Sequence, residues 1–341
     1  MGSASRRIGK DVIAVAPHRG AHRVALRAAF CVAVPLLTLW ALGRLDLSVY
    51  ATFGAFASLY GRHDSYPDRI RMQLAAAVTL LVVMLLGTVV AVLQAPTLVR
   101  IVVVALVAVV VSGLAQAARW HPPGALFAVF AAGAIATLPV DPGAFADVVI
   151  VGGSAAAFSV LVTVVIATAR RGPRSIGPLR SAPWQRPDLL AAVGVGLGAM
   201  LAGLAGLALV GTHWYWAMVA AVAALGGVHV TARIVRGLQR LAGTLVGVLI
   251  AAGILALHLP PLVTIAVAVL CQAGAELFIG RNYGIAMLFV TPLALLMIDL
   301  AVPSDPAELL RDRVLDTVIG VVIGTVIAVL SARVRRRRPT A

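Results

Sequence analysis

Arginines at helical spacing are the residues of this apolar sequence that are best suited to chemistry. Arg236 and Arg240 are four residues apart, and Arg233 lies one turn before Arg236. Residues at this spacing share one face of a helix, and a guanidinium binds a carboxylate through two parallel hydrogen bonds. The pattern predicts a vestibule that attracts small organic anions. The alternative is a row of anchors that reach to lipid phosphates.

Four further residues are candidates for the same anion vestibule. Arg69 aligns with Arg236 when the sequence is shifted by 167 residues, and Arg71 lies close to Arg69. Arg281 and Tyr283 stand at the start of another apolar segment. We therefore expect cationic side chains from both halves of the sequence near one anion pathway.

Three carboxylates lie within or at the ends of apolar segments. An ionisable group near the centre of a membrane helix costs about 2.5–3.5 kcal/mol, so it usually faces a partner or a cavity. Asp316 and Asp147 occupy matching places in the two halves, and they are candidates for proton uptake and release in an antiport cycle. The alternative pairs Asp316 with Arg313 and leaves Asp147 at the outer surface. Glu276 and Arg281 form a similar candidate pair.

Trp214, Tyr215 and Trp216 stand together at the start of a predicted membrane helix. Amphipathic aromatic rings favour the membrane interface whatever the function of the protein. These three side chains are therefore expected at an interface, and they are also candidates for stacking on an aromatic substrate.

The motifs of several enzyme classes are absent. Lys10 is the only lysine and stands in no Walker phosphate loop. The seven histidines show no HExxH or clustered metal-ligand spacing, and no G-x-S-x-G nucleophile elbow occurs. Cys31 and Cys271 lie singly in apolar runs, which predicts buried structural thiols. The sequence predicts no enzyme, no metal and no other cofactor.

The elements that position these residues are predicted to be membrane helices. Of the 341 residues, 61% are hydrophobic and 12% charged, and the mean hydropathy is +1.01. Soluble domains are typically about 45–50% apolar and about 25% charged, so this composition excludes a soluble enzyme. A spanning helix needs about 20 apolar residues. The twelve candidate spans are approximately 24–42, 47–61, 73–93, 98–118, 124–140, 145–168, 189–210, 213–230, 238–258, 262–280, 283–300 and 314–332. The segment 47–61 is the shortest of them, at about 22 Å, and a tilted or re-entrant segment is the alternative there.

The basic residues predict the orientation of these spans. The formal net charge is +15, and 24 of the 28 Lys and Arg residues lie in segments that face the cytoplasm if the N-terminus is inside. This asymmetry predicts a multi-pass protein of the plasma membrane with both termini cytoplasmic. It also indicates that the positive charge marks a membrane side and not a nucleic-acid partner. The four basic residues outside this set are Arg44, Arg100, Arg311 and Arg313.

The chain reads as two parallel repeats of six helices. VYATFGAFASLYG in the first half corresponds to WYWAMVAAVAALGG in the second, and both lead through arginines into a further apolar run. Parallel repeats place a transport pathway near the repeat interface. The predicted organisation is a basic cytoplasmic segment at 1–23, a repeat at 24–168, a linker at 169–188, a repeat at 189–332 and a basic tail at 333–341. The tail is a candidate contact for anionic lipid.

The second half carries several short motifs in a characteristic order. They are His213 to Trp216, Arg236-x-x-x-Arg240 with Gly243-Thr244 and Gly247, Arg281-Asn282-Tyr283 with Thr291-Pro292, and Arg313-x-x-Asp316-Thr317-x-x-Gly320. In these motifs the chain resembles the fusaric-acid-resistance-like (FUSC) family, within the aromatic acid exporter group. The first half resembles the same module more weakly.

The resemblance implies an all-α membrane permease or exporter, often of aromatic carboxylic acids. The hypothesis is a proton-coupled secondary exporter of small organic, including aromatic, anions. One alternative is an anion channel, because the six-helix module is also similar to plant aluminium-activated malate transporters, which work as dimers. By that analogy the chain is an internal pseudo-dimer or a homo-oligomer. The other alternative is a non-transporting membrane scaffold or partner subunit.

Overall fold

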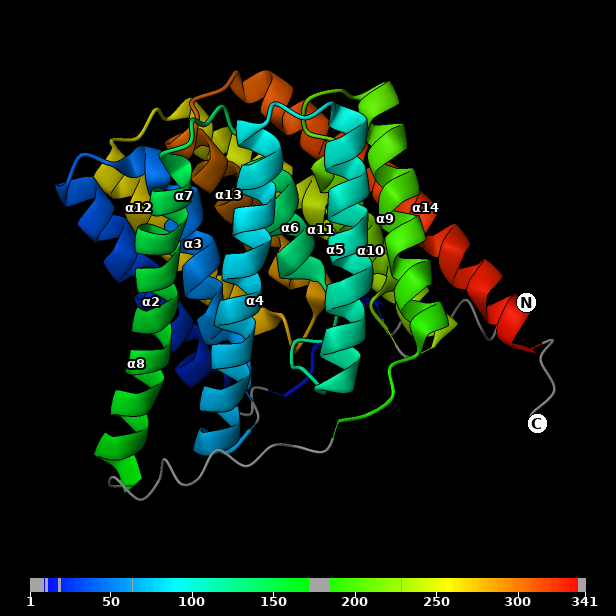
Figure 1. Cartoon of the computed structure of the whole chain (residues 1–341), viewed down its shortest axis with the longest axis horizontal. Helices are drawn as coiled ribbons and strands as arrows, with labels where there is room; N and C mark the ends of the chain where they lie inside the picture. The colour runs from blue at the N-terminus through cyan, green and yellow to red at the C-terminus, as the bar shows by residue number, and fades with distance from the viewer. Residues whose placement is uncertain are drawn as a thin grey trace.

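The computed structural model describes residues 9, 12–17, 20–62, 64–171, 184–227 and 229–336. Within these residues all regular elements are helical and no strand occurs, which confirms the all-α prediction. Successive helices alternate in direction and pack into one bundle (Figure 1). Large parts of the predicted linker and of the two predicted basic end segments lie outside the described residues.

Nine helical segments in the described part of the chain are long and apolar enough to cross a membrane. Each coincides with a segment that the sequence predicted as a span. They are α2 (Ala21–Ala41), α4 (Tyr66–Val92), α5 (Thr97–Ala117), the continuous segment of α7 (Ala144–Asp147), the π-helical turn η3 (Val148–Gly152) and α8 (Gly153–Arg171), then α9 (Leu189–Leu209), α11 (Val230–Ala256), α12 (Pro261–Phe278), α13 (Tyr283–Ala301) and α14 (Pro306–Arg336).

Three further apolar helices are short. They are α3 (Ser48–Ala55) with its flanking 3₁₀ turns η1 (Leu45–Leu47) and η2 (Phe56–Leu59), α6 (Leu126–Ala136) and α10 (Tyr215–Leu225). A helix of 11 residues, such as α6 or α10, is about 16 Å long, whereas the hydrocarbon core is about 30 Å thick. The sequence predicts spans at 124–140 and 213–230 and a short, tilted or re-entrant segment at 47–61, and the structure has short helices at all three places.

The short helices lie inside the bundle. Every residue of α3 and of α10 is buried, so neighbouring helices and not lipid surround them. Backbone groups at a helix end are tolerated at membrane depth where they are buried in protein or line a cavity. Hydropathy reports how apolar a segment is and does not report where its helix ends, which is why the lengths predicted at 124–140 and 213–230 were too great.

The outer faces of the long helices expose apolar side chains. Leu249 on α11, Leu270 on α12 and Val110 on α5 are 72%, 69% and 66% exposed. Such faces are costly in water but are normal where lipid surrounds a protein. The chain is therefore a multi-pass membrane protein.

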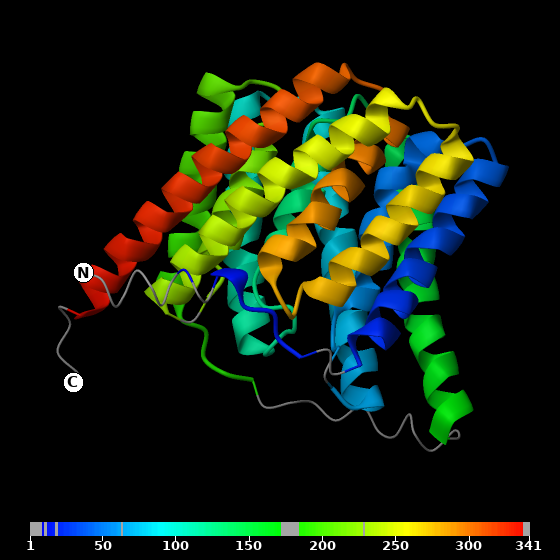
Figure 2. The ribbon, with the colours of Figure 1, turned by 180° about the vertical axis from the view of Figure 1, so that it is seen from behind.

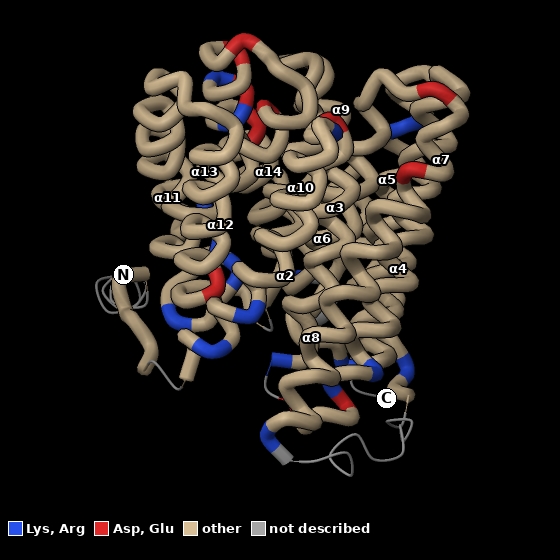
Figure 3. Tube along the Cα trace, turned by 90° about the vertical axis from the view of Figure 1, so that its left-hand side faces the viewer, with Lys and Arg blue, Asp and Glu red and all other residues tan. Residues whose placement is uncertain are grey.

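Most charged residues lie toward the two ends of the bundle. Lys and Arg gather mainly at the lower end in Figure 3, and most acidic residues lie toward the upper end. The sequence predicts that the basic end faces the cytoplasm, and this orientation stays a prediction.

The two halves of the chain pack against each other through long helices. Helix α2 of the first half lies along α12 of the second, seen from behind in Figure 2. Helix α5 of the first half lies along α9 of the second (Figure 1). Cys31 on α2 and Cys271 on α12 are both free and buried, as the sequence predicted.

Glycines allow α14 to approach α10 closely. A Cβ atom on Gly320 would overlap the carbonyl oxygen of Ala217, and one on Gly324 would lie 2.8 Å from the carbonyl oxygen of Ala221. Small residues at this spacing permit backbone-to-backbone contact between membrane helices. The contact holds the motif residues of α14 against the start of α10.

Candidate functional site

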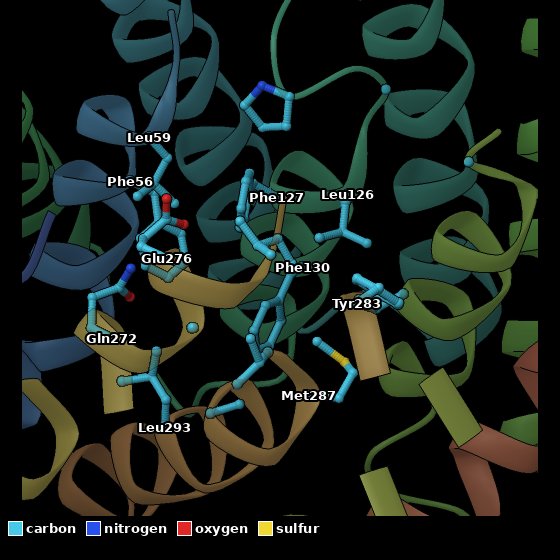
Figure 4. Close-up of a pocket in the computed structure, with 18 of the residues that line it drawn as sticks. Phe56, Leu59, Leu126, Phe127, Phe130, Gln272, Glu276, Tyr283, Met287 and Leu293 are labelled. Carbon is cyan, nitrogen blue, oxygen red and sulfur yellow. The ribbon is translucent and has the colours of Figure 1, made fainter. Parts of the chain in front are cut away.

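A cavity of about 400 Å³ lies between the two halves of the chain. We call it the central cavity. The first half contributes α3, η2 and α6, and the second half contributes α10 to α14. In Figure 4, Phe127 and Phe130 lie between Glu276 on one side and Tyr283 on the other. Its wall is mainly apolar, and its ionisable and amide side chains include Arg62, Arg236, Arg240, Gln272, Glu276 and Arg313.

Four phenylalanines of the first half form an aromatic wall. Phe53 on α3 and Phe56 at the start of η2 are three residues apart, and Phe127 and Phe130 are three apart on α6, so each pair shares one face. The ring centroids of Phe53 and Phe130 lie 5.1 Å apart, as do those of Phe56 and Phe127. Tilted and edge-to-face pairs at this separation are favourable. The wall offers ring faces to an aromatic ligand.

Two arginines of α11 meet Tyr283 of α13 on the opposite wall. Arg240 donates a hydrogen bond from Nη1 to Tyr283 Oη at 2.7 Å, and its side chain is buried. The Cζ atom of Arg236 lies 3.9 Å from the centroid of the Tyr283 ring. Because residues four apart share one face of a helix, both arginines lie at the cavity. Tyr283 therefore orients both guanidinium groups beside the aromatic wall.

Arg313 of α14 is a third arginine at the central cavity. It is 1% exposed, and its Nε and Nη1 atoms have no hydrogen-bond partner among the described residues. Its Cζ atom lies 5.2 Å from the Trp216 ring of α10. A buried guanidinium with unused donors is costly unless an anion or water reaches it. Arg313 is thus suited to bind an anionic group.

Glu276 pairs with Arg62, and the predicted pair of Glu276 with Arg281 does not form. Arg62 Nη2 lies 2.6 Å from Glu276 Oε2. Arg281 instead donates from Nε to the carbonyl oxygen of Ala16 at 2.9 Å. Arg62 precedes α4, far from Glu276 in the sequence, so only the packing of the two halves brings this pair together. Because Arg62 is neutralised by Glu276, the remaining arginines give the cavity an excess of positive charge.

Asp316 and Asp147 lie in different surroundings. Asp316 on α14 is fully buried, and neither carboxylate oxygen has a hydrogen-bond partner among the described residues. The alternative pairing of Asp316 with Arg313 is not present as an ion pair in the described part of the chain. Asp147 lies 3.9 Å from Arg44, and its side chain is 34% exposed. This agrees with the alternative in which Asp147 is a surface residue.

Next to Asp316 on α14, Asp312 contacts His213. The Oδ2 atom of Asp312 lies 2.8 Å from His213 Nδ1, and the His213 ring stacks on Trp216 with centroids 4.6 Å apart. His213 and Trp216 both belong to the turn that opens α10. This end of α14 therefore gathers buried titratable groups around the start of a short helix.

Four predicted vestibule arginines do not line the central cavity. Arg69 donates to the carbonyl oxygens of Gly61 and Asp64 and thereby holds the turn before α4. Arg71 lies 3.6 Å from Asp68, and Arg233 donates to the carbonyl oxygen of a loop glycine, Gly227. The fourth, Arg281, binds the N-terminal segment as described above. A single sequence pattern does not show which side of a helix faces the cavity, so these positions were indistinguishable from Arg236 and Arg240.

The aromatic triplet is buried among neighbouring helices and does not face lipid. Trp214 and Tyr215 are 2% exposed and Trp216 is 0% exposed. Neighbouring helices enclose α10 on all sides, which removes these rings from lipid. Their level relative to the membrane interface stays a prediction. Tyr215 lies beside the aromatic wall, with its ring centroid 6.3 Å from that of Phe130.

The aromatic wall, Arg62 and Arg313 were not predicted as site residues. Four of the nine phenylalanines of the sequence line the central cavity. Two segments of the first half each carry two phenylalanines three residues apart, and the predicted repeats align these segments with parts of the second half that carry family motifs. This repeated spacing could have indicated the aromatic wall. Arg313 could also have been singled out, because it is one of the four basic residues that lie in segments predicted to face the outside.

A known protein family matches much of the second half of the chain, which supplies Arg236, Arg240, Tyr283 and Arg313 to the cavity. Residues 192–327 match the fusaric acid resistance protein-like family. The expected family resemblance is therefore confirmed over α9 to α14, and the four residues all lie within the matched range.

The chain is also similar to a curated bacterial protein. It is 36% identical over 129 residues to the uncharacterized membrane protein YvaC of Bacillus subtilis (strain 168). The similarity covers 37% of this chain and 20% of the length of YvaC. No solved structure matches the chain. These likenesses agree with a multi-pass membrane protein.

Proposed function

We propose that this chain is a transporter that carries small aromatic carboxylates out of the cell across the cytoplasmic membrane. The observation that supports this function is the central cavity, which combines an aromatic wall with an excess of arginine side chains. A volume of about 400 Å³ falls at the lower end of the range of about 300–1,000 Å³ for small-molecule sites. That volume suits a single-ring acid.

The proposed binding mode divides the ligand between the two walls. The ring lies among Phe53, Phe56, Phe127 and Phe130, where offset and edge-to-face contacts are available. The carboxylate accepts hydrogen bonds from Arg236 and Arg240, which Tyr283 orients. A planar guanidinium fork matches a carboxylate in geometry as well as in charge.

We further propose that proton movement drives the export. Asp316 supports this because a buried carboxylate with no partner among the described residues is costly when ionised, so it exchanges a proton when its surroundings change. It is three residues from Arg313 on the same face of α14, and Arg313 lines the central cavity. A change of charge on Asp316 alters the electrostatic potential at Arg313 and thereby couples proton binding to anion binding.

The proposed path lies between two parallel six-helix repeats. The helix contacts support the repeats. In the two repeats α2 corresponds to α9 and α5 to α12, and the contact of α2 with α12 is matched by that of α9 with α5. Within the halves, α4 packs on α6 as α11 packs on α13, and α3 packs on α8 as α10 packs on α14. This pattern is expected for a pseudo-twofold axis along the membrane normal. The chain then acts as an internal pseudo-dimer.

Flux through the purified protein in liposomes tests the proposed function. Benzoate, 4-hydroxybenzoate and malate are followed with and without an imposed pH gradient, for the wild type, Arg236→Gln and Arg71→Gln. Arg71 is the matched control because it pairs with Asp68 and does not line the central cavity. We expect pH-driven accumulation of the aromatic acids that Arg236→Gln reduces and Arg71→Gln preserves.

The other outcomes contradict the proposal in different ways. Flux that follows only the membrane potential, with no response to the pH gradient, identifies a channel. Equal transport of malate and benzoate argues against the aromatic site. The absence of flux for all three anions, from protein that unfolds cooperatively on heating, favours a scaffold or partner subunit.

A further inference from the structure

A second cavity lies next to the central cavity. It has a volume of about 430 Å³ and includes Arg100, Thr137 and His213 in its lining. The second cavity reaches Ala301 at the end of α13 and Gly211 before α10, whereas the central cavity reaches the opposite ends of these helices, at Tyr283 and Gly226. The two cavities are thus at different depths along the bundle.

Three apolar residues line both cavities. They are Val49 on α3, Ala134 on α6 and Ile298 on α13. Val49 and Ala134 are each 5% exposed. Because the same three side chains face both spaces, they form the partition between them. We call them the shared wall.

Aromatic rings lie beside the shared wall. Phe53 follows Val49 by four residues and Phe130 precedes Ala134 by four, so each ring lies one helical turn from a wall residue. The Phe53 and Phe130 rings contact each other within the central cavity. Tyr215, which stacks near Phe130, belongs to the lining of the second cavity. Apolar and aromatic groups therefore separate the cationic groups of the two cavities.

We propose that the two cavities are the inner and outer parts of one translocation path, and that Val49, Ala134 and Ile298 form its closed gate. This inference rests on the proposed transport function. An apolar constriction blocks ions because water withdraws from it, and a carboxylate cannot enter such a layer without losing its hydration. The wall joins α3 and α6 of the first half to α13 of the second. Movement of one half against the other therefore opens it.

The second cavity offers groups that suit a released anion. Arg100 donates from Nε to the carbonyl oxygen of Ala95 and from Nη1 to that of Ala136, so its guanidinium is held at the end of α6. Thr137 and His213 add further polar atoms to the same space. A carboxylate that passes the shared wall thus meets a fixed cation on the outer side.

Labelling of single cysteines tests the gate without depending on transport. Cys31→Ala and Cys271→Ala remove the two native thiols, both buried. Val290→Cys then reports on the central cavity and Thr137→Cys on the second cavity, since each position lines one cavity only. A membrane-impermeant sulfonate methanethiosulfonate reagent is added to vesicles of either orientation. We expect labelling of the two reporters from opposite sides of the membrane.

Truncation of the wall is the decisive step. Ile298→Ala is expected to raise the labelling rate of Val290→Cys from the outer side several-fold, and Val49→Ala to do the same independently. Leu293→Ala is the matched control, because Leu293 is on the same helix and lines only the central cavity. It is expected to leave the sidedness of labelling unchanged.

The results distinguish a failure of the proposed gate from a failure of the proposed substrate. Labelling of both reporters from one side, or no response to either wall truncation, overturns the gate. Benzoate transport together with an unresponsive Val290→Cys also counts against the gate and leaves the transport function intact. If each reporter is labelled from one side of the membrane only, and Ile298→Ala removes this difference between the sides, the gate is supported. If the same result is obtained but no aromatic acid is transported, only the proposed substrate is wrong.

Discussion

Arg62 and Glu276 form an ion pair of 2.6 Å that connects the two halves of the chain. Arg62 lies in the turn before α4, and Glu276 lies on α12. Both residues line the central cavity and also a third cavity of about 530 Å³, whose lining includes Arg27 and Arg170. The pair therefore stands at the boundary between the central cavity and a basic vestibule.

Glu276→Gln is expected to destabilise the protein. The side chains of Arg62 and Glu276 are 14% and 6% exposed, and removing one partner of a buried pair typically costs about 3–5 kcal/mol because the other charge stays buried. The midpoint of thermal unfolding in detergent measures this loss. Asp68→Asn is the control. The side chain of Asp68 is half-exposed, so its ion pair with Arg71 contributes at most about 1 kcal/mol to stability. Equal shifts for the two variants would contradict a stabilising role for Glu276.

Gly320→Ala is expected to separate α14 from α10. The added methyl group would overlap the carbonyl oxygen of Ala217, and overpacking of this kind costs about 1–3 kcal/mol. Gly113→Ala on α5 adds the same group where nothing lies within 4 Å, so it is expected to be neutral or stabilising. Thermal unfolding of both variants checks this, and a neutral Gly320→Ala would show that the two helices can shift apart without loss.

Asp316→Asn is expected to remove the response of transport to the pH gradient while downhill flux of benzoate remains. The substitution keeps the shape of the side chain and removes its titration. Asp147→Asn is the matched control because Asp147 is partly exposed and lies near Arg44. Flux in liposomes with and without a pH gradient is the measurement. An unchanged gradient dependence in Asp316→Asn would exclude Asp316 as the coupling group.

Phe127→Leu is expected to weaken the binding of benzoate relative to hexanoate. Aromatic contacts contribute about 0.5–1.5 kcal/mol beyond the buried area, and Leu keeps an apolar surface without the ring. Phe30→Leu is the control, since Phe30 is on α2 and is 52% exposed. Titration calorimetry with the purified protein gives both affinities. A parallel loss for the two acids would show that the wall recognises apolar surface and not aromatic character.

Much of the architecture could be predicted from the sequence. Apolar segments of about 20 residues with few charges require helices in a membrane, because a spanning backbone must satisfy its own hydrogen bonds. All nine long helical segments of the described chain coincide with predicted spans. The spacing of Arg236 and Arg240 on one helix face is likewise a local property, and the structure places both beside Tyr283.

The tertiary structure decided the features that depend on distant partners. Hydropathy did not distinguish the enclosed helices α3, α6 and α10 from lipid-facing spans, because both are uniformly apolar. The partner of Glu276 is 214 residues away in the sequence, and the aromatic wall meets the arginines only where the two halves pack. Local composition determines which segments enter the membrane, whereas side-chain packing between halves determines which charges pair, which stay unpaired and where a cavity remains.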